Sequence, residues 1–167
     1  MFELSVFFQA IEDNHPAHVR EALRAHPEMV MSESAQGLLP LVLASHYGFR
    51  EIVDLLLTHG ADVNCSSHSR LPFFPSNTPL HAAIEGKNDP VVILKLLNAG
   101  ARLDILDSNG CLPLHVAALK DRPEVIGLLL EHGASPDAMT ANGETALHIA
   151  ERADRVDIAA ILKRERP

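Results

Sequence analysis

The sequence predicts an all-α protein, a solenoid of about five repeated helix pairs. A Thr-Pro-Leu-His tetrapeptide at residues 78–81 returns in related form at residues 112–115 and 145–148, and more loosely at 39–42. A leucine-rich stretch that ends in glycine follows the first three copies, at Gly60, Gly100 and Gly133. A motif that recurs at a near-constant spacing is typical of stacked units, each of which buries its apolar face on the next.

The first helix of each pair is predicted to begin near the tetrapeptide. Its proline stands in the first helical turn, where the missing N–H loses no hydrogen bond. The predicted spans are residues 41–47, 80–85, 114–120 and 147–153. Small residues recur along one side of these segments, so we expect close approach between helices of adjacent units. They are Ala44, Ala82, Ala83, Ala117, Ala118 and Ala150.

The second helix of each pair carries the larger apolar side chains. Ile52, Val53, Leu55 and Leu56 represent this pattern in the best-formed copy. The glycine that follows is predicted to take the left-handed conformation that ends a helix.

Both terminal units depart from the pattern. Phe8, Ala10 and Ile11 stand at first-helix positions near the N-terminus, but Pro27 replaces the terminating glycine. Terminal units need one face that meets water, so we expect both to act as caps. The predicted organisation is a single domain, 1–167. Its units are an N-terminal cap (1–31), three central repeats (32–64, 65–104 and 105–137) and a C-terminal capping repeat (138–167).

The spacing between copies locates an insertion. We compare the spacing of two recurring residues with a 33-residue period: the prolines at 40, 79 and 113, and the glycines at 60, 100 and 133. The comparison places six extra residues between Gly60 and Pro79. A further residue falls between Pro79 and Gly100, where the paired helices join. The insertion therefore predicts one extended loop between Asn64 and Thr78.

Composition narrows the partner and the compartment. The net charge of −8 argues against nucleic acid as a partner, because a phosphate backbone requires clustered Lys and Arg. No run of apolar residues is long enough to cross a membrane, so no membrane contact is expected. Two cysteines do not make a secreted disulfide framework. An acidic residue, Glu3, stands where a signal peptide would be basic, which favours the cytoplasm, or the nucleus in a eukaryotic cell.

The repeated segments resemble the ankyrin repeat. Residues 48–64, from Gly-Phe-Arg-Glu-Ile-Val to Gly-Ala-Asp-Val-Asn, follow that family's consensus over their whole length, and residues 143–148 follow its first-helix motif. The similarity covers residues 31–163 well and the first thirty residues weakly. It implies an L-shaped stack of helix pairs with β-turn fingers. It also implies a non-enzymatic scaffold for protein–protein contact that needs no cofactor or metal.

The extended finger loop is the first candidate site. Its tip carries Leu71, Phe73 and Phe74, and Pro72 and Pro75 flank the two phenylalanines. Apolar side chains exposed together mark contact sites, and rigid flanking prolines reduce the entropy lost on binding. The alternative is that both phenylalanines fold back to cover an adjacent finger or the groove.

A wider candidate surface follows from positions that vary in the family's fingers and inner helices. Tyr47 stands out, because tyrosine is enriched in binding hot spots; alternatively, it is a half-buried helix residue. The whole predicted partner-binding set is Leu71, Phe73, Phe74, Asn77, Gln36, Leu38, His46, Tyr47, Glu85, Ser108, Asn109, Cys111, Leu119, Lys120, Asn142, Glu144 and Arg152.

The histidines are predicted to be structural. His81, His115 and His148 share one position of the tetrapeptide, and a repeated position has a repeated cause. Cys65 and His68 have a spacing that can bind zinc, but no second pair follows. Asn64 resembles ankyrin asparagines that are hydroxylated in animal cells, although a structural role in the finger turn is favoured.

Three functions follow from these observations. The first is an adaptor that binds a folded protein, with a basic partner favoured by the acidic charge, and that is monomeric when unbound. The second is an inhibitor or immunity-type protein that covers the active site of a toxin or enzyme. The third, an enzyme or metal protein that uses Cys65 and His68, is disfavoured because the repeat template leaves few residues free for chemistry.

Overall fold

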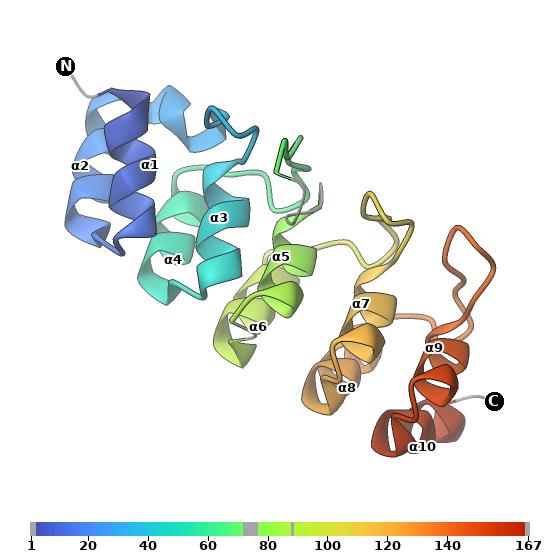
Figure 1. The fold of residues 1–167 in the computed structure, drawn as a ribbon. Coiled ribbons are helices and arrows are strands. Elements are labelled where there is room, and N and C mark those ends of the chain that lie inside the picture. The colour runs from blue at the N-terminus through green and yellow to red at the C-terminus, as the bar shows by residue number, and fades with distance from the viewer. Residues whose placement is uncertain (1–2, 72–76, 88, 166–167) are drawn as a thin grey trace. The chain divides into compact units, whose positions relative to one another are not determined.

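The computed structural model describes residues 3–71, 77–87 and 89–165. Regular structure in these ranges is helical, and the chain divides into two compact units, residues 1–101 and 102–167. The helices form successive antiparallel pairs, as coloured from blue to red in Figure 1. The predicted all-α helix-pair architecture is therefore confirmed.

The first unit contains three helix pairs and a short 3₁₀ helix. The pairs are α1 (Leu4–Glu12) with α2 (Pro16–Ala25), α3 (Pro40–Tyr47) with α4 (Arg50–Thr58), and α5 (Pro79–Glu85) with α6 (Pro90–Asn98); η1 (Pro27–Met31) follows α2. Helix α3 packs against both α1 and α5, while α4 packs against α2 and α6. First helices thus stack on first helices, and second helices on second helices.

The second unit repeats this arrangement with two pairs. They are α7 (Pro113–Leu119) with α8 (Pro123–Glu131) and α9 (Ala146–Arg152) with α10 (Val156–Arg164). Helix α7 packs against α9, and α8 packs against α10.

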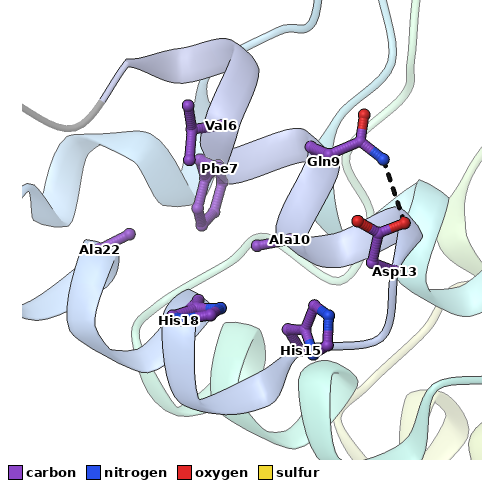
Figure 2. Close-up of a pocket in the computed structure, with 8 residues that line it drawn as sticks. All are labelled: Val6, Phe7, Gln9, Ala10, Asp13, His15, His18 and Ala22. Atoms are coloured by element: carbon purple, nitrogen blue, oxygen red, sulfur yellow. Dashed lines mark hydrogen bonds between the residues drawn. The ribbon is translucent and has the colours of Figure 1, made fainter.

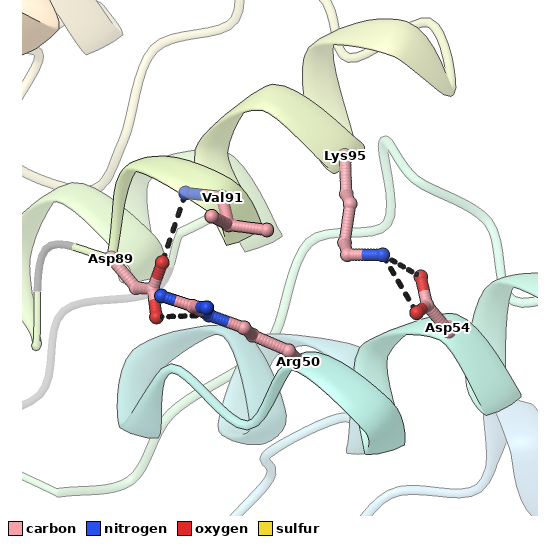
Figure 3. A network of polar contacts seen from close by, with 5 residues as sticks. All are labelled: Arg50, Asp54, Asp89, Val91 and Lys95. Carbon is pink, nitrogen blue, oxygen red and sulfur yellow. Dashed lines mark hydrogen bonds and ion pairs between the residues drawn. The ribbon is translucent and has the colours of Figure 1, made fainter.

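The two helix types bury different fractions of their surface. Six consecutive residues of α3, from Pro40 to Ser45, are buried, because α3 has neighbours on both sides and its own partner behind it. Helix α4 buries only one stripe, formed by Ile52, Val53 and Leu56. Its solvent face forms ion pairs with α6 and its N-cap (Figure 3). Lys95 Nζ lies 2.6 Å from Asp54 Oδ1, and Arg50 Nε donates to Asp89 Oδ2 over 2.7 Å.

Asp89 also caps α6. Its Oδ1 accepts a hydrogen bond from the Val91 N–H over 2.9 Å. Partial burial works to raise the pKa of Asp89, but the hydrogen bonds from Arg50 and Val91 outweigh it and hold that pKa below its ordinary value. The carboxylate therefore joins α4 to α6 and starts the second helix.

Left-handed residues end the second helices as predicted. Gly60, Gly100 and Gly133 have φ of +88°, +91° and +93°. No atom would crowd a Cβ at these positions, so backbone conformation rather than space requires glycine there.

The fingers are short hairpins with one repeated hydrogen-bond pattern. In three of them the first residue bonds through its N–H to the carbonyl of the residue four positions later, over 2.9 Å. A side-chain oxygen of that first residue accepts from the N–H groups two and four positions on. The three hairpins are Ser34 to Leu38, Asp107 to Cys111 and Thr140 to Glu144.

The remaining finger contains the insertion. The Ser67 N–H donates to the Asn77 carbonyl over 3.1 Å, so the closing bond spans ten residues instead of four. This difference of six confirms the size and place of the predicted insertion. Phe73 and Phe74, the main predicted contact residues, lie outside the described residues.

Within the described ranges, no helix is long and apolar enough to cross a membrane.

Candidate functional site

Five residues of the predicted partner-binding set line one cavity in the first unit. They are Gln36, Leu38, His46, Tyr47 and Leu71. The cavity holds about 200 Å³ and is bounded by α1, α3, the first finger and the rising limb of the long finger. Part of the predicted finger and inner-helix surface thus meets Leu71 of the long finger around one hollow in this unit.

The long finger reaches this cavity because its rising limb pairs with the first finger. The His68 N–H donates to the Gly37 carbonyl, and the Arg70 N–H to the Gln36 carbonyl, each over 2.9 Å. A Cβ on Gly37 would lie 2.1 Å from the His68 carbonyl oxygen, so this approach requires glycine. Leu71, the next residue along this limb, lines the cavity.

Aromatic contacts hold Tyr47 in position. Its ring stacks on Phe49 with centroids 5.4 Å apart and an interplanar angle of 23°. The His46 ring meets it edge-on at 5.5 Å. Tyr47 is half-buried, as the alternative interpretation of this residue stated, and it also faces the cavity. A rigid, partly exposed tyrosine loses little entropy when it binds.

Four further cavity residues were not predicted as part of the site. They are Phe8, Glu12, Ser34 and Leu43. Phe8 and Glu12 lie one turn apart on α1, so helical spacing was the signal that could have joined them. The weak family similarity over the first thirty residues concealed this wall of the cavity.

Other predicted site residues of the first unit have structural partners. Asn77 is only 1% exposed, and its Nδ2 donates to Glu85 Oε2 over 2.8 Å. Leu38 is also buried. Their side chains therefore shape the surface from beneath, and direct partner contact by Asn77 or Leu38 stays a prediction.

In the second unit the predicted residues divide in the same way. Ser108, Asn109 and Asn142 are exposed at finger tips, whereas Cys111 is buried. The inner helices expose three more residues. These are Leu119, which is 44% exposed, Lys120, and Arg152, which forms an ion pair with Glu144.

A larger cavity contains none of the predicted residues. It holds about 470 Å³ on the outer side of α1 and α2, next to Val6, Phe7 and Ala10 (Figure 2). The Gln9 side chain donates to Asp13 over 3.1 Å at its edge. This hollow lies on the end face of the N-terminal cap.

His115 has the structural role that was predicted for the repeated histidines. His115 is fully buried; its Nδ1 accepts from the Leu112 N–H over 3.1 Å, so the proton resides on Nε2, which donates to the Ala138 carbonyl over 3.0 Å. Burial lowers the pKa of His115 below its ordinary value, although the Ala138 carbonyl works to raise it. The neutral ring connects its own repeat to the next.

Cys65 and His68, considered for zinc binding, and Asn64, considered for hydroxylation, are buried or contact other residues of the chain. Cys65 is buried, and His68 Nδ1 lies 2.7 Å from Glu33 Oε1. Across the part of the chain that the structure describes, no three His, Cys, Asp or Glu side chains are grouped to hold a metal. Asn64 joins its finger to Gly100, whose carbonyl accepts from Asn64 Nδ2 over 3.2 Å.

Comparison with known families agrees with this geometry. A family model described as ankyrin repeats in three copies matches residues 7–103 and again residues 80–166. The chain belongs to the ankyrin repeat family, and the resemblance inferred from the sequence is confirmed.

Several known proteins share part of the chain. An ankyrin repeat protein of fowlpox virus is 30% identical over 116 residues, which are 69% of this chain and 32% of the viral protein. Mouse cyclin-dependent kinase 4 inhibitor B is 42% identical over 71 residues, 42% of this chain and 49% of the inhibitor. Mouse Rabankyrin-5 is 31% identical over 85 residues, 51% of this chain and 7% of that protein. The chain therefore matches about a third to a half of the first two relatives. The family and these relatives together support a protein–protein interaction module.

Proposed function

We propose that the protein is a non-catalytic interaction module that binds a folded partner through its finger loops and inner helices. The observation that carries this proposal is the convergence of Gln36, His46, Tyr47 and Leu71 on one hollow. Aromatic and apolar side chains around a partly desolvated hollow are typical of the anchoring part of an interface.

The proposal includes the extended loop. Leu71 extends along the first finger toward the cavity, and Phe73 and Phe74 follow it in the sequence. In this proposal the two phenylalanines add their apolar contact area to that of Tyr47. With a net charge of −8, the chain favours a basic partner, since complementary charge speeds encounter.

The test removes the proposed contact side chains without removing the scaffold. Tyr47→Ala, Phe73→Ala and Phe74→Ala are combined, and captured proteins are identified by mass spectrometry and then titrated in purified form. We expect at least a hundredfold loss of affinity for the partner that the wild type captures, because hot-spot truncations cost about 2 kcal/mol or more each.

A matched control substitutes exposed residues of the second helices. Val91→Ala, Glu124→Ala and Glu131→Ala together should leave affinity within about threefold. If the aromatic variant binds as tightly as the wild type while both variants keep their helical content, this surface is not the binding site.

A second candidate is an inhibitor that covers the active site of an enzyme. It is favoured by the 42% identity to a protein named cyclin-dependent kinase 4 inhibitor B. In the test, purified cyclin-dependent kinase 4 is titrated with the wild-type chain, and phosphorylation of the kinase's substrate is measured along with binding. If no binding is detected at about 100 µM, a concentration at which even weak complexes form, this kinase is excluded as a target. The proposal of a protein-interaction module is not affected by that result.

Localisation in the cytoplasm, or in the nucleus of a eukaryotic cell, is also a proposal. Cell fractionation with an antibody against the native chain is its direct test.

A further inference from the structure

Successive fingers are joined by a repeated backbone hydrogen bond. In the first unit the His68 N–H donates to the Gly37 carbonyl, and in the second unit the Ala141 N–H donates to the Gly110 carbonyl, each over 2.9 Å. In both cases the donor is the residue directly after the first residue of its finger, and the acceptor is the glycine of the finger before. The same bond is therefore found once in each unit.

The first finger has the equivalent donor, and the described residues include no earlier finger. Its equivalent residue is Ala35, which follows Ser34 and is exposed. In the described part of the chain, no carbonyl accepts from the Ala35 N–H in the way that Gly37 and Gly110 do for the later fingers. By the symmetry of the repeat, this N–H points to the side of the first finger that faces away from the second finger.

Ala35 also lines a groove. A cavity of about 550 Å³ lies between α1 and residues 33–36 of the first finger. Leu4 and Phe8 of α1 form its apolar wall, and Ala35 lies on the opposite wall. We call this groove, bounded by Leu4, Phe8, Glu12, Glu33 and Ala35, the finger slot. Its volume is that of sites which accept a few residues or a small ligand.

The charge of the finger slot is acidic. Glu12 on α1 and Glu33 on the finger both line it, and no Lys or Arg is among the described residues that do. Glu33 also pairs with His68, and the Arg70 guanidinium bonds the Ala35 carbonyl over 3.4 Å from the long finger. The slot therefore offers one backbone donor, an apolar wall and carboxylates on both sides.

We propose that the finger slot binds an extended segment of a partner protein in which an apolar residue is flanked by Lys or Arg. The proposal rests on the function proposed above and names the kind of partner segment. A backbone carbonyl of the segment accepts from the Ala35 N–H, as the glycine carbonyl does in the later fingers. The apolar side chain contacts Phe8, and the basic side chains pair with Glu12 and Glu33. Backbone pairing supplies affinity and the side chains supply selectivity, as in other cases of strand addition to an open edge.

Ala35→Pro isolates the key hydrogen bond. The three-residue hairpin closed by Ser34 and Leu38, with Gly37 left-handed, is typical of a type I turn in which Ala35 is the second residue. Proline is favoured at that position, so the substitution removes the N–H and keeps the turn. Ala35→Ser retains the N–H and is the matched control.

The experiment selects ligands from a random ten-residue peptide display library on the immobilised full chain. Enriched peptides are synthesised and titrated by fluorescence anisotropy. We expect an apolar residue flanked by Lys or Arg, and affinity that falls at least fivefold in Ala35→Pro but less than twofold in Ala35→Ser. Glu12→Gln with Glu33→Gln should weaken binding at least threefold. In the wild type, bound peptide should slow hydrogen exchange of the Ala35 amide, a measurement that needs no variant.

Three results would overturn the proposal. They are no enrichment above background, enriched peptides that bind Ala35→Pro as tightly as the wild type, and a dimer in analytical ultracentrifugation that Ala35→Pro dissolves. The last would assign the slot to a second copy. If the slot fails while the Tyr47, Phe73 and Phe74 variant still loses its partner, only the slot is refuted. If Ala35→Pro lowers peptide affinity but the aromatic variant keeps the partner, the aromatic surface is refuted instead.

Discussion

Replacing His115 should cost much more stability than replacing the equivalent His148. The His115 ring is fully buried and joins the Leu112 N–H to the Ala138 carbonyl through hydrogen bonds of 3.1 and 3.0 Å. Each such bond contributes about 0.5–1.5 kcal/mol. Burial of the apolar area of the ring contributes about 1–2 kcal/mol more. His115→Ala should therefore lower the free energy of unfolding by about 2–5 kcal/mol.

His148→Ala is the matched control. Its ring is exposed and accepts one longer bond, from the Thr145 N–H over 3.3 Å, so we expect a loss below about 1 kcal/mol. Urea unfolding followed by circular dichroism gives both values. With a slope of about 2 kcal/mol per molar urea, the His115→Ala midpoint should fall by about 1–2.5 M.

Protonation provides a second measurement of the same contacts. Burial lowers the pKa of His115, so the ring binds a proton more readily in the unfolded chain, whose pKa is about 6.5. Its stabilising contribution is present above pH 6.5 and is lost as the pH falls below it. The difference in stability between the wild type and His115→Ala should therefore be smaller at pH 5.5 than at pH 7.5. Equal losses for the two alanine variants, together with unchanged exchange of the Leu112 amide, would refute the reasoning.

Three other changes test separate features of the fold. Burial raises the pKa of the Cys65 thiol to about 12, so ionisation favours the unfolded chain. The free energy of unfolding should then fall by up to about 1.4 kcal/mol per pH unit above about pH 8.5. Urea unfolding from pH 7 to 10 measures this dependence, and it should be weaker in Cys65→Ala. Ser45→Ala should raise the melting temperature, by an amount that corresponds to about 0.5–2 kcal/mol, because the buried Ser45 hydroxyl has no hydrogen-bond partner among the described residues. A lower melting temperature would contradict this. Ala141→Pro should be about 1 kcal/mol less stable than Ala35→Pro in urea, because only Ala141 donates to a neighbouring finger; equal stability would mean that the inter-finger bond contributes nothing.

The repeated parts of the fold could be predicted because each copy reports on the others. The tetrapeptide prolines fall at the first residue of α3, α5 and α7, and the glycine track falls at left-handed residues after the second helices. The same comparison sized the insertion, which the bond between Ser67 and Asn77 then located within one finger. Backbone stereochemistry and burial constrain these positions in the same way in each unit, so sequence spacing alone carried the information.

Positions without an equivalent in other copies were harder to predict. The burial of Asn77 and its bond to Glu85 depend on how the inserted finger returns to α5, and no other repeat contains such a return. Likewise, Phe8 and Glu12 line the cavity beside Tyr47, but α1 has little consensus sequence to identify its inner face. Side-chain contacts across nonequivalent elements have no periodic signal.

Both candidate contact surfaces involve the first finger, and the reason is the way the repeat is interrupted around it. In a regular array, each finger is covered on one side by its predecessor and on the other by its successor. Among the described residues no carbonyl accepts from the Ala35 N–H, while Gln36 and Gly37 pair with a following finger that is six residues longer than its counterparts. The first finger therefore has a backbone N–H with no acceptor among the described residues, and a longer finger beside it. Variants there should alter recognition far more than they alter stability.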